Sequence, residues 1–186
     1  MKIFTFIFTS LFFVSILLLG AFFYILWHFG KDLPDYRQLS KYEPSVVTRV
    51  HAANGALLKE YSVQQRVFVP IDVIPKKIIS AFLSAEDKHF YDHIGVDVQA
   101  ITRALITNLK NYGKGKRLVG ASTITQQVAK NFLLSSEVTF ERKIKEAILA
   151  IRIERAFSKK EILELYLNEI YLGNNSYGIA AAALNY

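Results

Sequence analysis

Hydrophobic residues follow one another without a charge at the start of the chain, whereas polar and apolar residues alternate through the rest. No charged residue occurs from Ile3 to Trp27. A helix of that length spans about 37 Å, enough to cross a bilayer core of about 30 Å. Bulky residues follow the small pair Gly20-Ala21, where a cleaved signal peptide would need small residues. The pattern therefore favours an uncleaved, single-pass anchor over residues 1–30.

Turn and strand signals follow the anchor. Residues 31–45 carry two prolines and mixed charges, which indicates a linker. The dipeptide Asn54-Gly55 separates two strand-like runs, 46–51 and 56–61, and predicts a hairpin with a two-residue loop. Residues 66–69 can add a third short strand. We therefore predict a linker and short β segment over residues 31–70, before a main domain over residues 71–186.

Helical spacing of apolar residues dominates beyond Pro75, so the fold class is mainly α. Most of the predicted helices follow a residue suited to capping. Residues 110–117 contain two glycines and four basic residues and predict a mobile loop. The helices predicted after the first are 98–111 capped by Asp97, 123–134 capped by Ser122, 140–157 capped by Thr139, 159–172 opened by a Ser158–Glu161 capping box, and a last helix from about Tyr177.

Composition narrows the class of protein. The chain of 186 residues is 52% hydrophobic, has a net charge of +7 and contains no cysteine. These values exclude intrinsic disorder, a disulfide scaffold and a cysteine-ligated zinc site. Basic residues are slightly more numerous after the anchor than before it. The positive-inside rule alone would therefore put the main domain in the cytoplasm, by a small margin.

The first candidate site surrounds two adjacent carboxylates, Glu86 and Asp87, at the end of an apolar helix. His89, His93 and aromatic rings follow within a few residues. A carboxylate beside apolar and aromatic surface can act as a general base or acid. From spacing alone, a helix end with solvated charges is the favoured alternative. A metal site of Glu86, His89 and His93 is a further alternative, but it lacks an HExxH-type signature.

Two further segments, one at the start of a predicted helix and one on a helix face, carry polar side chains that could bind a ligand. Gly120 and Ser122 lead into a helix whose free N–H groups could attract phosphate, although an ordinary capped helix explains the pattern equally well. Arg142 and Glu146 share a helix face, and apolar residues flank Glu146 on both sides. That flanking is expected for a carboxylate in a walled cleft, but this segment alone slightly favours a routine surface ion pair. Residues 159–168 are interpreted mainly as core.

In this order, the segments resemble the peptidoglycan glycosyltransferase domain (glycosyltransferase family 51) of class A penicillin-binding proteins. A fifth motif begins at Gly178. The first four are Glu86-Asp87-x-x-Phe90-x-x-His93-x-Gly95, Gly120-x-Ser122-Thr123-Ile124-x-Gln126-Gln127-x-x-Lys130, Arg142-Lys143-x-x-Glu146 and Lys159-x-x-Ile162-Leu163-x-x-Tyr166-Leu167-Asn168.

The resemblance implies a lysozyme-like, mainly α domain with a membrane-embedded lobe. The family continues with further helices past the position of Tyr186, so the domain is expected to be C-terminally incomplete. No Ser-x-x-Lys motif of a penicillin-acylating transpeptidase domain is present.

The activity implied by the resemblance is polymerisation of lipid II into β-1,4-linked glycan strands, with inversion and release of undecaprenyl pyrophosphate. Glu86 matches the general base and Glu146 the second catalytic carboxylate. The remaining matches imply binding of sugar and pyrophosphate by Asp87, His93, Ser122, Thr123, Gln126, Gln127, Lys130, Arg142 and Lys143.

The resemblance also implies partners and location. A divalent ion, Mg²⁺ or Mn²⁺, near Glu146 is left open, and no other cofactor is expected. The expected partners are lipid II, the growing glycan chain, the inner membrane and other cell-wall synthesis proteins, with no nucleic acid. Lipid II is polymerised outside the cytoplasmic membrane, so the domain is expected on the periplasmic or extracellular side, against the small excess of positive charge.

Two alternative functions remain from the sequence. A lysozyme-like or lytic transglycosylase enzyme would cleave glycan, but it needs neither an anchor nor basic residues such as Lys130, Arg142 and Lys143. The second alternative is an inactive membrane-anchored fragment.

Overall fold

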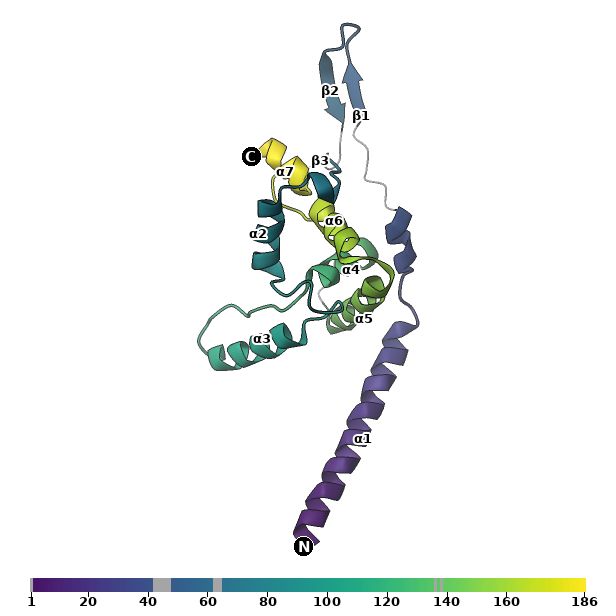
Figure 1. Ribbon diagram of the computed structural model, residues 1–186, viewed down its shortest axis with the longest axis vertical. Coiled ribbons are helices and arrows are strands. Elements are labelled where there is room, and N and C mark those ends of the chain that lie inside the picture. The colour runs from purple at the N-terminus through teal and green to yellow at the C-terminus, as the bar shows by residue number, and fades with distance from the viewer. Residues whose placement is uncertain (1, 42–47, 62–64, 136, 138) are drawn as a thin grey trace.

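The computed structural model describes residues 2–41, 48–61, 65–135, 137 and 139–186, and the fold is mainly helical, as predicted. Figure 1 shows a helical body from which a long helix and a β-hairpin extend at opposite ends. The elements are α1 (Lys2–Gly30), η1 (Tyr36–Lys41), β1 (Thr48–His51), β2 (Leu57–Tyr61), β3 (Gln65–Arg66), η2 (Ile71–Val73), α2 (Lys76–Glu86), α3 (Val98–Asn111), α4 (Ile124–Leu133), α5 (Phe140–Ala156), α6 (Lys159–Glu169), β4 (Ser176–Tyr177) and α7 (Ile179–Asn185).

The N-terminal helix α1 has the length and composition of a membrane span. Its stretch Phe4–Gly30 has a mean hydropathy of 2.5, and its side chains are not buried in the protein. The last turn of α1 packs against α5, where Arg152 Nη2 donates to the Gly30 carbonyl oxygen at 3.3 Å. The predicted apolar helix is therefore present and meets the helical body at α5.

The segment that follows α1 packs onto the body through η1. Leu39 is buried in the main core, and Leu33 and Tyr36 lie against the same cluster. A single leucine among polar residues has no periodicity, so sequence reasoning predicts only a linker here. The remaining linker positions, 42–45, lie outside the described residues.

The predicted hairpin is present, with β1 and β2 antiparallel. Its loop is longer than the predicted two residues, because the Ala52 N–H bonds the Ala56 carbonyl oxygen across it. Gly55 adopts a φ of 83°, and the Asn54 side chain accepts the Ala56 N–H. Val46 and Val47, predicted to begin the first strand, lie outside the described residues. The short strand β3 pairs in parallel with β4 rather than with the hairpin.

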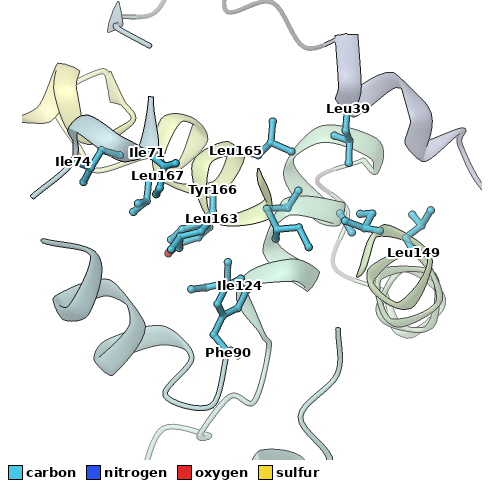
Figure 2. Close-up of a cluster of buried hydrophobic side chains, with 14 residues drawn as sticks. Leu39, Ile71, Ile74, Phe90, Ile124, Leu149, Leu163, Leu165, Tyr166 and Leu167 are labelled. Carbon is cyan, nitrogen blue, oxygen red and sulfur yellow. The ribbon is translucent and has the colours of Figure 1, made fainter. Parts of the chain in front are cut away.

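The core lies where α4, α5 and α6 pack together. Figure 2 shows Phe90, Ile124 and Tyr166 side by side, with Leu149 and Leu39 farther along the same cluster. Phe90, Ile124 and Leu149 are fully buried. Burial of each such side chain contributes about 1.5–3 kcal/mol to folding. This core fixes the start of α4 and one face of α5, which carry most of the predicted site residues.

Three predicted helix boundaries require correction. Thr123, not Ser122, caps α4, because its hydroxyl accepts the Gln126 N–H while the Gln126 side chain bonds the Thr123 N–H. Ser158 and Glu161 form the predicted capping box of α6, but that helix ends at Glu169 rather than at residue 172. The chain then turns into β4, and α7 begins at Ile179 instead of near Tyr177. The caps predicted at Asp97 and Thr139 are confirmed.

Candidate active-site cleft

One cleft of about 390 Å³ collects most of the predicted site residues from three helices and a loop. Glu86 comes from the end of α2, and Gly120 and Ser122 come from the loop before α4. The other predicted residues that line it are Gln126, Gln127 and Lys130 of α4 and Arg142, Lys143 and Glu146 of α5. Segments 60 residues apart in the chain therefore meet around one cavity, which contains two carboxylates and three cationic side chains.

The carboxylate of Glu86 is exposed and held at the cleft by one side chain. Gln127 Nε2 donates to Glu86 Oε2 at 2.8 Å. The buried Tyr166 lies near enough to feel the charge of Glu86, and its hydroxyl has no hydrogen-bond partner among the described residues. Burial, and then the charge of Glu86, raise the pKa of this hydroxyl above its ordinary value. Tyr166 is thus a neutral, buried side chain near Glu86.

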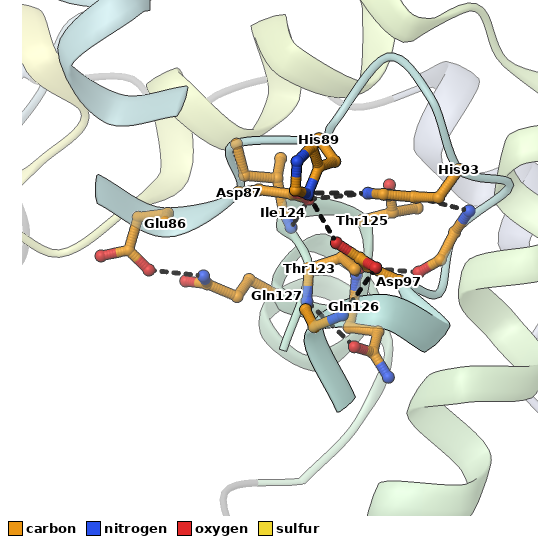
Figure 3. A network of polar contacts seen from close by, with 12 residues as sticks. Glu86, Asp87, His89, His93, Asp97, Thr123, Ile124, Thr125, Gln126 and Gln127 are labelled. Atoms are coloured by element: carbon orange, nitrogen blue, oxygen red, sulfur yellow. Dashed lines mark hydrogen bonds and ion pairs between the residues drawn. The ribbon is translucent and has the colours of Figure 1, made fainter. Parts of the chain in front are cut away.

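Asp87 faces away from the cleft that Glu86 lines and binds the start of α4. Figure 3 shows its carboxylate between His93 and Ile124, accepting the Ile124 N–H at 2.9 Å. His93 Nε2 lies 3.0 Å from Asp87 Oδ2, and His93 Nδ1 accepts the Gly95 N–H. This leaves the ring proton on Nε2, where it is donated to Asp87. The two residues expected to bind substrate are therefore engaged with each other and with protein backbone.

Thr123 is also occupied within the protein. Its hydroxyl donates to the Gly95 carbonyl oxygen at 2.6 Å, in addition to capping α4. A second cavity of about 250 Å³ lies on the other side of Glu86 and is lined by both Asp87 and Thr123. Sequence reasoning did not single out Lys88 and Arg103, which also line it. Lys88 occupies an unspecified position of the first motif and Arg103 lies on α3, so no signal in the sequence marks either residue.

Glu146 is buried beneath the cleft between two cations. It is 1% exposed, its Oε1 lies 2.7 Å from Arg142 Nη1, and its Oε2 accepts from Lys143 Nζ. Lys143 Nζ also donates to Ser122 Oγ at 2.7 Å. The walled position predicted from the apolar flanks of Glu146 is thus observed. Arg142 Nε is buried and has no hydrogen-bond partner among the described residues.

The residues around Glu146 do not suit a protein-held metal ion. Both of its oxygens contact a cationic side chain, and cations repel a divalent ion. Within the described residues, no three His, Asp or Glu side chains are grouped so that they could hold a metal. The alternative metal site of Glu86, His89 and His93 is therefore not formed. Glu86 bonds Gln127, whereas the two histidines bond Asp97 and Asp87.

A further carboxylate, Asp97, fixes the entry to α3. Its side chain accepts the Ala100 N–H at 2.8 Å and lies 3.3 Å from His89 Nδ1. Burial acts to raise the pKa of this carboxyl, but the Ala100 N–H and His89 outweigh burial and hold the pKa below its ordinary value. Asp97 therefore remains an anion that stabilises the helix start beside the second cavity.

Comparison with known proteins agrees with the resemblance in the motifs. Residues 54–186 match the transglycosylase family. Proteins described as penicillin-binding protein 1A are similar to this chain. That of Rickettsia felis is 56% identical over 163 residues, which cover 88% of this chain and 21% of the relative. That of Aquifex aeolicus is 51% identical over 156 residues, covering 84% and 21%. That of Neisseria flavescens is 49% identical over 154 residues, covering 83% and 19%. The chain thus spans about a fifth of the length of these relatives.

Proposed function

Because the chain belongs to the transglycosylase family, we propose that it polymerises lipid II into peptidoglycan glycan strands. The observation that carries this proposal is the composition of the cleft. An exposed carboxylate, Glu86, lies across one cavity from Lys130, Arg142 and Lys143. Transfer of a sugar from a pyrophosphate needs a base at the acceptor and positive charge at the leaving group.

In the proposed reaction, Glu86 removes the proton from the 4-hydroxyl of the acceptor N-acetylglucosamine. The resulting oxygen attacks the α-linked anomeric carbon of the growing chain from the opposite face. The new carbon–oxygen bond forms as the bond to pyrophosphate breaks, so the product is β-linked and the configuration is inverted. The electron pair leaves with undecaprenyl pyrophosphate, and the proton remains on Glu86 until it passes to solvent.

The cationic side chains receive the negative charge of the leaving group. Lys143 is 47% exposed and Lys130 is exposed, so both can reach a bound pyrophosphate. Glu146 orients Arg142 and Lys143 toward the cleft by pairing with both of them. We assign Ser122, Gln126 and Gln127 to the sugar and phosphate oxygens, since all three line the same cavity. No step is routed through a metal ion, because the surrounding residues do not suit one.

The proposed location is the outer face of the cytoplasmic membrane, with α1 as a single-pass anchor. Contact of the domain with the membrane surface is supported by α3, which lies at the level where α1 leaves the body (Figure 1). Its apolar side chains Ile101, Leu105 and Leu109 are exposed, as is the basic loop that follows. An apolar face beside cationic residues suits an anionic membrane surface, where the lipid carrier of the substrate lies.

A polymerisation assay tests the proposal against glycan cleavage. The full-length protein, reconstituted in lipid vesicles, is supplied with lipid II in one reaction and with purified cell-wall sacculi in another. We expect long glycan strands from lipid II and no soluble muropeptides from sacculi. Release of muropeptides without polymerisation would replace the proposal with a lytic enzyme. Inactivity in both reactions, with a cooperative thermal melt, would favour a non-catalytic role.

A further inference from the structure

A partly buried ion pair joins the end of α5 to the start of α6, outside the cleft. Lys159 Nζ lies 2.7 Å from Glu154 Oε1, and the two side chains are 22% and 6% exposed. Both residues oppose the helix dipole, because Glu154 lies in the last turn of its helix and Lys159 in the first turn of its own. Helix stability therefore does not explain why these charges occur here.

The lysine also binds the loop that follows Glu86. Its Nζ donates to the His93 carbonyl oxygen at 2.7 Å and lies 4.4 Å from the centre of the Phe90 ring. The His93 ring in turn donates to Asp87, the neighbour of Glu86 in sequence. Lys159 thus fixes the loop of residues 87–95 from behind.

The glutamate binds the helix that forms the opposite wall of the cleft. Thr125, in the first turn of α4, donates its hydroxyl hydrogen to Glu154 Oε1 at 2.6 Å. Two hydrogen bonds also connect the start of this helix to the loop. The Asp87 carboxylate accepts the Ile124 N–H, and the Thr123 hydroxyl donates to the Gly95 carbonyl oxygen. The loop and the helix are therefore held to the same ion pair.

The orientation of Glu86 depends on both the loop 87–95 and α4. Its backbone continues directly into the loop that Lys159 holds, and its carboxylate accepts a hydrogen bond from Gln127 of α4. Glu154 and Lys159 line neither of the two cavities beside Glu86, so they do not touch substrate there. We propose that Glu154 and Lys159 are positioning residues, which hold loop 87–95 and α4 in the register that sets Glu86 against the acceptor.

This inference rests on the proposed function, and the test separates the two. Lys159→Met is compared with Lys160→Met, which removes the same charge one residue later, where Lys160 pairs with the exposed Asp72 at the surface. Since Lys159→Met leaves Glu154 buried and unpaired, the double variant Glu154→Gln/Lys159→Met is included. Lys159→Arg keeps the charge and serves as the rescue variant. All are measured as full-length protein, per folded molecule.

We expect kcat for lipid II polymerisation to fall about 10- to 100-fold in Lys159→Met and in the double variant. KM should stay within about twofold, Lys160→Met should match the wild type, and Lys159→Arg should recover most of the loss. Hydrogen exchange at the Gly95 and Ile124 amides should speed up at least about tenfold in the two impaired variants only.

Unchanged kcat in Lys159→Met and the double variant would overturn the inference, whatever happens to their melting temperature. If the wild type itself does not polymerise lipid II, the proposed function fails instead. The amide exchange then decides the positioning role alone: faster exchange at Gly95 and Ile124 supports it, and unchanged exchange overturns it.

Discussion

Gly95 lies against the backbone of Ala150, so closely that a Cβ at position 95 would be 2.7 Å from the Ala150 carbonyl carbon. The φ of Gly95 is also +97°, which side chains rarely adopt. We therefore expect Gly95→Ala to lower the free energy of unfolding by at least about 2 kcal/mol. Gly120→Ala is the control, because Gly120 has open space around it, and its cost should stay within about 0.5 kcal/mol. Thermal melts in detergent measure both, and equal melting temperatures would contradict the close approach.

Sequence reasoning predicted the parts of the fold that depend on local pattern. The membrane-length helix follows from a run without charges, and the caps at Asp97, Thr139 and Ser158 follow from residue type and the helix after each. Glu146 was predicted to be walled because apolar residues flank it on the helix. These features need only the residues within one or two helical turns.

The remaining features depend on contacts between distant segments. Neighbouring Ser122 and Thr123 both suit a cap, and only the Gln126 contact and the Gly95 carbonyl select Thr123. Asp87 carries no local signal that distinguishes a substrate ligand from a group that binds the start of α4. Glu154 was not among the predicted site residues. An acidic residue in the last turn of a helix opposes the helix dipole, and this signal could have identified it.

The pH dependence of stability should reflect Asp97. Because its folded-state pKa is lowered from the ordinary value of 3.8, its charge stabilises the fold above that pH, and this contribution is lost as the pH falls through the lowered value. We expect Asp97→Asn, which keeps a capping side chain, to be less stable than wild type at neutral pH and equal to it in strong acid. Asp97→Ala should cost about 1 kcal/mol more, through the lost cap. A constant difference from pH 7 to pH 2 would contradict this role.

Substitution of single lysines in α5 tests whether turnover depends on a charge in the cleft or on the net charge of the helix. We expect Lys143→Met to lower turnover of lipid II about 10- to 100-fold, the value of one charged hydrogen bond of about 1.5–3 kcal/mol. Lys145→Met is the matched control, because Lys145 pairs with the exposed Glu141 away from the cleft. Its turnover should be unchanged. Equal losses in the two variants would show that net charge, and not the position of Lys143, governs turnover.

Because the chain contains no cysteine, single introduced cysteines can be labelled to test the proposed orientation in the membrane. Lys114 is exposed in the basic loop after α3, whereas Lys2 precedes the apolar stretch Phe4–Gly30 of α1. In intact spheroplasts, a membrane-impermeant maleimide should label Lys114→Cys at once and Lys2→Cys only after permeabilisation. The reverse pattern would put the domain in the cytoplasm, where the small excess of positive charge alone would direct it.

Polymerisation of lipid II by Glu86→Gln tests most directly whether Glu86 is the base. Glutamine has nearly the same shape as glutamate but cannot accept the hydroxyl proton, and Glu86 is exposed, so the fold should persist. We expect kcat to fall at least about 100-fold with an unchanged melting temperature and near-normal binding of lipid II. Near-normal polymerisation by folded Glu86→Gln would show that another group removes the proton.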